Sequence, residues 1–208
     1  MILKKLIWSI ILFYTHKRYP NMHKNAYMQL GNTIGNRFNL IMGENSTLNS
    51  DSIILNRRAK LIIGKNSGAA TKLLVVTGNH MNIVGMNLKQ VTDDVKDAED
   101  KNHEYDKDVI VEDDVWIGAG VTLLSGVRIG RGCEVGTCAV VRNSTPPYSI
   151  VIGNPAKVVG FRFTPEEIIE HEKVQYPENE RLPIELLEKN YNKYFLKRIK
   201  EIREWTRL

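Results

Sequence analysis

The chain has five histidines, and His80 stands out because it ends a segment with the pattern of a strand. The segment Val76-Thr77-Gly78-Asn79-His80 closes a run of regularly spaced apolar residues and precedes a long stretch without that spacing. A histidine at such a place is held by rigid backbone yet open to solvent. Because histidine changes charge near neutral pH, this position suits a general base. On position alone, a surface histidine without a catalytic role is the alternative interpretation.

The other reactive side chains give no sign of a metal site. Cys133 and Cys138 are too few for a disulfide framework or a zinc cage. A zinc hydratase of the γ-carbonic anhydrase type needs three histidines around its metal, and only His80 is well placed. We therefore expect no metal and a reducing, cytoplasmic environment.

A period of six residues predicts the scaffold that positions His80. One aliphatic series and one small or β-branched series, four places later, run in a single register from Val111 to Pro146. The first series is Val111, Ile117, Leu123, Ile129, Val135 and Val141, and the second is Val115, Val121, Val127, Cys133, Ala139 and Thr145. The period fits neither a helix nor an alternating strand, and predicts a parallel β-helix with three hexads per turn.

The same register continues upstream. Three apolar residues, Ile63, Ala69 and Val75, precede Val111 by whole multiples of six. Weaker hexads begin earlier, near Leu30, and are offset from this register by three residues. The shift predicts a small corner insertion. We expect an N-terminal helical segment at 1–28, a β-helix at 29–160 with a loop excursion at about 81–108, and C-terminal helices at 161–208.

The expected excursion is acidic. Between Asp93 and Asp114 there are eleven acids against three lysines. Long loops in a compact repeat are usually functional or disordered. A solvated loop and a loop that closes over a substrate are equally compatible with this composition.

The net charge of +5 is concentrated at the N-terminus, where the first 43 residues carry +6 and the remainder carries −1. No base-stacking or groove-reading element accompanies these cations, so we expect no nucleic-acid partner. The apolar segment Leu6–Tyr14 is too short to span a bilayer. A helix packed on the end of the coil and a peripheral helix at the inner membrane surface are the two interpretations.

The sequence predicts helices in the C-terminal region. Thr164-Pro165-Glu166-Glu167 combines an N-cap, a first-turn proline and a capping-box acid. A second helix is expected from Pro183, with apolar residues at three- and four-residue spacing through Ile202.

An ordered set of motifs resembles the hexapeptide-repeat acyltransferases, and most closely the galactoside, maltose and capsular-polysaccharide O-acetyltransferases. The motifs are Gly78-Asn79-His80, Val115-Trp116-Ile117-Gly118-Ala119, Gly126-Val127-Arg128-Ile129-Gly130, Pro146-Pro147-Tyr148 and Gly153-Asn154-Pro155-Ala156-Lys157. The resemblance covers about residues 30–160 and implies a left-handed coil. The tail around Glu172 is similar to those of bacterial capsule-cluster members, which is a weaker likeness.

The resemblance also implies a site. His80 would be the base, the backbone N–H of Ala119 would bind the oxyanion, and Asn79 and Trp116 would bind the acceptor, with corner packing as the alternative for Trp116. Acetyl-CoA would be the acyl donor. Its contacts would be Gly118, Ala119, Thr137, Arg142, Asn143 and Lys157, although the family often has Thr-Lys where this chain has Arg142-Asn143.

The expected function is therefore acetyl-CoA-dependent O-acetylation of a saccharide or nucleotide sugar, in surface polysaccharide biosynthesis. The resemblance implies a homotrimer with active sites between subunits, so that His80 and Trp116 come from different chains. N-acetylation of an amino-sugar nucleotide and a non-catalytic β-helix scaffold are the alternatives.

Overall fold

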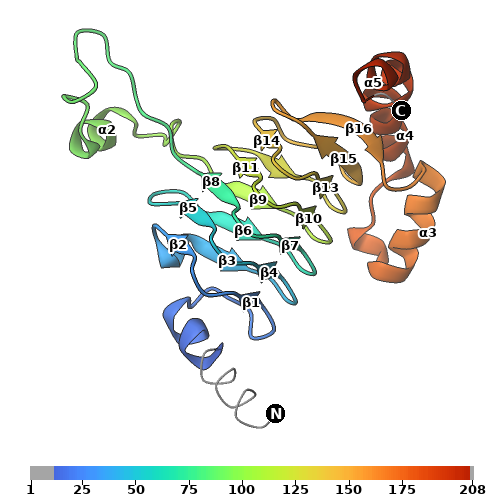
Figure 1. Cartoon of the computed structure of the whole chain (residues 1–208), viewed down its shortest axis with the longest axis horizontal. Coiled ribbons are helices and arrows are strands. Elements are labelled where there is room, and N and C mark those ends of the chain that lie inside the picture. The colour runs from blue at the N-terminus through green and yellow to red at the C-terminus, as the bar shows by residue number, and fades with distance from the viewer. Residues whose placement is uncertain (1–11, 207–208) are drawn as a thin grey trace.

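The computed structural model describes residues 12–206, most of which form a coil with three flat faces (Figure 1). Each face is a sheet of parallel strands, apart from β16, which runs antiparallel to β15. The seven-stranded sheet contains β1 (Tyr27–Met28), β4 (Thr47–Leu48), β7 (Gly68–Ala69), β10 (Trp116–Ile117), β13 (Glu134–Val135), β15 (Ser149–Ile152) and β16 (Lys157–Phe161). The five-stranded sheet contains β2 (Thr33–Ile34), β5 (Ile53–Leu55), β8 (Leu74–Val76), β11 (Thr122–Leu123) and β14 (Val140–Val141). The four-stranded sheet contains β3 (Leu40–Met42), β6 (Leu61–Ile63), β9 (Val109–Val111) and β12 (Arg128–Ile129).

The predicted register is confirmed. Ile63 pairs with Val111, Ala69 with Ile117 and Val75 with Leu123. Each of these pairs is 48 residues apart, which is 30 more than the 18 that separate Val111 from Ile129 one turn later. The chain therefore leaves the coil after β8 and returns to the same register at β9.

The earlier turns are wider than the later ones. Leu40 pairs with Leu61 at a separation of 21 residues, as the shift in phase predicts. Buried Asn56, in the corner between β5 and β6, supports the wider turn by exchanging two hydrogen bonds of 2.9 Å with the backbone of Asn36. The start of the repeat differs from the expectation, because Leu30 is 64% exposed and Met28 is the residue that faces inward. The coil thus begins slightly before residue 29.

Side chains of the inward series fill the coil. Leu40, Leu123 and Ile129 are completely buried, and so is Cys133, which occupies a small inward position as expected. A large residue at such a position would collide with its neighbours, because protein interiors are closely packed.

The N-terminal end of the coil is covered by a helical segment at residues 12–18. Tyr19 and Met22 follow it and are buried, and Met22 forms a bridge with Met42 of β3. Most of the apolar segment Leu6–Tyr14 lies outside the described residues, so both interpretations of it stay predictions. Among residues 12–206, no helix has the length and apolar character needed to cross a bilayer.

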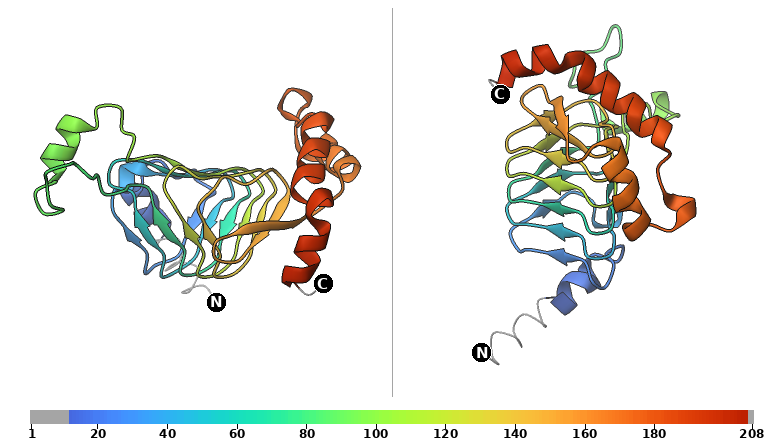
Figure 2. Two further views of the ribbon diagram at one scale, coloured as in Figure 1. Left: turned by 90° about the horizontal axis from the view of Figure 1, so that it is seen from above. Right: turned by 90° about the vertical axis from the view of Figure 1, so that its right-hand side faces the viewer.

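Residues 77–108 leave the coil between β8 and β9 and contain one helix, α2 (Asp93–Glu99). The two limbs of this excursion meet at a neck, where Gly78 and Asp106 form an antiparallel bridge. Figures 1 and 2 show the excursion projecting from the side of the coil opposite the C-terminal helices.

The C-terminal helices are α3 (Pro165–Gln175), α4 (Ile184–Tyr194) and α5 (Ile199–Thr206). The capping box of Thr164 and Glu167 is present, and α4 starts directly after Pro183, so both predicted helix starts are confirmed. The second helix is not continuous to Ile202, because Phe195 leaves the helical region at φ −122° and ψ −69°. A short 3-10 turn, Leu196–Arg198, then leads into α5. Two further 3-10 turns are Arg37–Asn39 and Glu178–Glu180.

Candidate active site

His80 lies at the neck of the excursion and is exposed. Its Nδ1 is 3.0 Å from the carbonyl oxygen of Met81. A carbonyl can only accept a hydrogen bond, so this contact assigns the proton of the neutral ring to Nδ1 and leaves the lone pair on Nε2. The imidazole is therefore arranged to accept a proton at Nε2.

The backbone next to His80 is fixed by the returning limb of the excursion. The Asn79 N–H donates to the carbonyl of Tyr105 at 2.8 Å, and the Lys107 N–H donates to that of Thr77 at 2.9 Å. Asn79 is exposed, as is His80. These contacts place both predicted residues, Asn79 and His80, at the mouth of the loop.

Trp116 lies on β10, on the outer face of the seven-stranded sheet, and is 52% exposed. It is thus not a corner residue. Its neighbour across the ladder is Gly68, where a Cβ would stand 3.1 Å from Cζ3 of the indole. The glycine allows the ring to lie flat against the sheet and leaves its other face open to a ligand.

Gly118, Ala119 and Thr137 line the corner between the seven- and five-stranded sheets. A Cβ on Gly118 would lie 2.7 Å from the backbone nitrogen of Thr137, so the two turns stack closely. The carbonyl of Ala119 accepts a hydrogen bond from the Cys138 N–H at 2.9 Å. Trp116 is two residues before this corner, so the structure brings four of the predicted site residues together.

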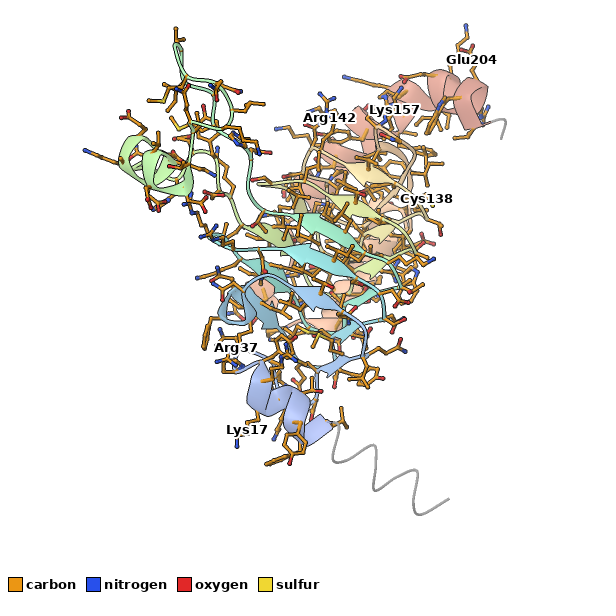
Figure 3. All side chains as sticks on the ribbon, turned by 60° about the vertical axis from the view of Figure 1, so that its left-hand side comes forward. Lys17, Arg37, Cys138, Arg142, Lys157 and Glu204 are labelled. Carbon is orange, nitrogen blue, oxygen red and sulfur yellow. The ribbon has the colours of Figure 1, made fainter. Side chains whose placement is uncertain are left out.

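Lys157 continues this edge at the end of the coil, while Arg142 and Asn143 lie across the five-stranded sheet, after β14. Figure 3 shows Arg142 and Lys157 at the end of the coil that the C-terminal helices cover. Lys157 contacts α5, since its Nζ lies 3.6 Å from Glu201 and 5.5 Å from the centre of the Trp205 ring. Arg142 and Asn143 are exposed.

His80 and Trp116 lie on different sides of one chain. The chain visits the seven-, five- and four-stranded sheets in turn, so the corner that follows β8 is opposite the seven-stranded sheet. His80 stands at that corner, whereas Trp116 stands on the opposite face. One chain therefore does not bring the proposed base to the edge formed by Trp116 and Ala119.

Two outer faces of the coil are apolar. Strands β3, β6 and β9 of the four-stranded sheet direct Ile41, Ile62 and Ile110 outward, and these side chains are half-buried. On the five-stranded sheet, Ile53 and Leu55 are 46% and 50% exposed. Such faces are typical of surfaces that another chain covers.

Asp100, the residue after α2, holds the returning limb of the excursion. Its carboxylate accepts hydrogen bonds from the Glu104 N–H at 2.7 Å and the Tyr105 N–H at 3.1 Å. Burial acts to raise the pKa of Asp100, but these two bonds and the charges of Lys96 and His103 outweigh it and lower the pKa below the usual 3.8.

We expect acid to loosen this limb. Because the folded pKa of Asp100 lies below its unfolded value, the stabilisation is complete above the unfolded value and is lost as the pH falls below it. Pepsin should therefore cut the loop of Asp100→Asn faster than that of the native chain at about pH 5, and the difference in rate should be smaller at about pH 2. Equal rates at both pH values would contradict the role of Asp100.

The sequence did not reveal several side chains that shape this region. Arg58, Lys96 and Asp106 form an ion-pair cluster under the neck. In the sequence these residues could not be told apart from the other charged residues around them, so their pairing was not predictable. Within residues 12–206, no three His, Cys, Asp or Glu side chains are grouped so as to hold a metal ion.

Comparison with known proteins agrees with this architecture. Residues 108–143 match the bacterial transferase hexapeptide (six repeats) family. A probable macrolide acetyltransferase of Lysinibacillus sphaericus is 37% identical over 120 residues, which are 52% of this chain and 64% of the relative. A chloramphenicol acetyltransferase of Escherichia coli is 44% identical over 61 residues, 29% of either chain. The chain thus spans less than two thirds of the length of these relatives.

Among solved structures, a maltose O-acetyltransferase from Clostridium difficile 630 superposes with a TM-score of 0.58 at 27% identity, covering 72% of both chains. A hexapeptide-repeat-containing acetyltransferase from Vibrio cholerae shares the fold, with a TM-score of 0.56 at 24% identity, over 69% of this chain and 74% of its own. The parallel ladders and these neighbours support the left-handed β-helix. Residues 108–143 and the fold of the chain are therefore similar to those of the hexapeptide-repeat transferases.

Proposed function

We propose that the chain is an acetyl-CoA-dependent O-acetyltransferase that acts on a saccharide hydroxyl in surface polysaccharide biosynthesis. The observation that carries the proposal is His80, with Nδ1 bonded to a carbonyl and Nε2 left as a proton acceptor at the mouth of the excursion. The match of residues 108–143 to hexapeptide-repeat transferases and the acetyltransferase names of the relatives support the reaction class.

In the proposed reaction, Nε2 of His80 removes the proton of an acceptor hydroxyl. The hydroxyl oxygen attacks the thioester carbonyl, and the backbone N–H of Ala119 donates a hydrogen bond to the oxyanion. The carbon–sulfur bond then breaks, and His80 returns the proton to the departing thiolate. The products are the acetyl ester and free coenzyme A.

The coenzyme would lie along the edge formed by Gly118, Ala119 and Thr137, because this edge runs parallel to the coil axis and exposes backbone at each turn. Lys157, at the end of the same edge, would pair with phosphate groups. Its present contact with Glu201 is exposed and weak enough to exchange for such a ligand. Arg142 and Asn143 would contact the coenzyme from across the five-stranded sheet.

A complete site would need two copies of the chain, since His80 and Trp116 lie on opposite sides of one coil. A cyclic homotrimer would place the neck of each chain against the Trp116 edge of the next, and would cover the apolar outer faces around Ile62 and Leu55. The opposite placement of the two residues supports this assembly.

The names of the relatives support a second acceptor class, the hydroxyl group of an antibiotic such as a macrolide or chloramphenicol. N-acetylation of an amino-sugar nucleotide is a further alternative, and a non-catalytic scaffold is the alternative outside enzymes. An amine needs less help from a base, so only that acceptor would tolerate loss of His80.

The test is an acetyl-transfer screen with the purified chain over oligosaccharides, nucleotide sugars, macrolides and chloramphenicol. We expect acetyl-CoA to raise the melting temperature and a saccharide to be acetylated. Transfer to an antibiotic alone would replace the saccharide assignment. If acetyl-CoA neither stabilises the chain nor undergoes slow hydrolysis of its thioester, the non-catalytic scaffold is favoured.

A further inference from the structure

Two of the acids of α2, Asp93 and Asp97, are paired with cations of the coil. Arg58, in the corner between β5 and β6, lies 2.9 Å from Asp97 and 3.4 Å from Asp93, and its side chain is only 18% exposed. Arg57, in the same corner, also pairs with Asp93. The wide corner therefore docks the excursion onto the coil, and these acids are not free to attract a cationic ligand.

A second ion pair lies deeper, at the neck itself. Lys96 Nζ is 2.7 Å from Asp106 Oδ2, and the two side chains are 11% and 8% exposed. Arg58 lies 3.7 Å from the same oxygen. Asp106 forms the bridge with Gly78, where any Cβ would lie 2.3 Å from Asp106 Oδ1. A charge pair this poorly exposed depends on both partners, because either one alone would be a desolvated charge.

Lys96 also reaches the residue before His80. Its Nζ donates a hydrogen bond of 2.9 Å to the carbonyl oxygen of Asn79. That carbonyl belongs to the peptide group that joins Asn79 to His80. Since the Asn79 N–H is bonded to Tyr105, both backbone groups of Asn79 are held by the excursion.

We infer that Lys96, held in place by Asp106, is a positioning residue that orients His80, an inference that rests on the proposed function. The ammonium group fixes the plane of the 79–80 peptide and so limits the directions in which the imidazole can point. Small losses of alignment lower the rate of a bimolecular reaction strongly. Lys96 is not among the residues proposed to contact acetyl-CoA, so its replacement should leave KM for the coenzyme unchanged.

The test is Lys96→Met, which keeps the length of the side chain and removes its charge and hydrogen bond. We expect kcat to fall roughly 10- to 100-fold with KM for acetyl-CoA unchanged. Amide exchange at Asn79, whose N–H is bonded to the Tyr105 carbonyl, should accelerate. Lys101→Met is the matched control, because Lys101 lies in the same excursion and is exposed.

To test whether Lys96 acts by positioning His80, the same substitution is made in the His80→Ala background and transfer is measured. If Lys96 acts through His80, Lys96→Met adds no further loss of transfer there. An equal loss in both backgrounds, or a kcat equal to that of Lys101→Met, overturns the inference while leaving the proposed function intact. Full activity of His80→Ala instead overturns the proposed function, whatever Lys96→Met does.

Discussion

Replacing His80 by alanine is expected to lower O-acetyl transfer roughly 100- to 10,000-fold, the range associated with loss of a general base. The residue is exposed, and its side chain makes one hydrogen bond, to the adjacent Met81 carbonyl. The free energy of unfolding and KM for acetyl-CoA should therefore stay unchanged. Release of the coenzyme thiol in the presence of the acceptor measures the effect.

The matched control is His103→Asn, at a second exposed histidine of the excursion. Asparagine is chosen because His103 has φ 53°, a left-handed conformation that asparagine tolerates well. This variant should keep full activity. If His80→Ala also keeps full activity with hydroxyl acceptors, His80 is not the base, whereas activity retained only with amines would identify an N-acetyltransferase.

Replacing Glu172 by alanine is expected to lower the free energy of unfolding by roughly 3–5 kcal/mol, as for other buried ion pairs that lose one partner. Glu172 belongs to α3 and is completely buried. Its carboxylate accepts hydrogen bonds from Tyr148 Oη at 3.0 Å, from Arg131 at 3.2 Å and from the Leu182 N–H. Burial, together with the charge of Glu172 and the hydrogen bond to it, raises the pKa of Tyr148, so this phenol stays protonated as a donor.

Without the carboxylate, three donors lose this acceptor: Arg131 of the coil, Tyr148 directly before β15, and the Leu182 N–H between α3 and α4. Urea unfolding compares this variant with Glu170→Ala on the same helix, where the exposed pair with Lys173 should contribute no more than about 1 kcal/mol. Near-ultraviolet circular dichroism should also lose the signal of Tyr148. Equal stability of the two variants would show that the C-terminal helices do not depend on Glu172.

The coil was predictable because its geometry repeats. Inward residues recur at 18 in each late turn, so the sequence carries the pairing of Val111 with Ile129 directly, and even the corner at Asn56 appears as a shift in phase. The break at Phe195 was not predictable, because a 3-10 turn places Ile199 and Ile202 where a continuous helix would also have apolar residues.

The predicted site residues could be placed only where the repeat reaches them. Trp116, Gly118, Ala119 and Thr137 follow the coil and lie together. The repeat gives no information on the ion pairs of Lys96, Asp106 and Arg58, because any of several acids in the excursion could have paired with either cation. Glu172 did leave a signal, because it stands four residues after buried Ile168 on the inner face of α3. An acid on an apolar face is a sign of a buried polar network.

The most direct test of the two-chain site mixes His80→Ala and Trp116→Ala subunits that carry different tags, with trimers purified through both. Each variant alone should be strongly impaired. In every mixed cyclic trimer, one of the three interfaces joins an intact His80 to an intact Trp116, so activity should return to about one third of that of the native trimer. Activity no higher than the average of the two variants would contradict a site shared between chains and place the base and Trp116 in separate roles.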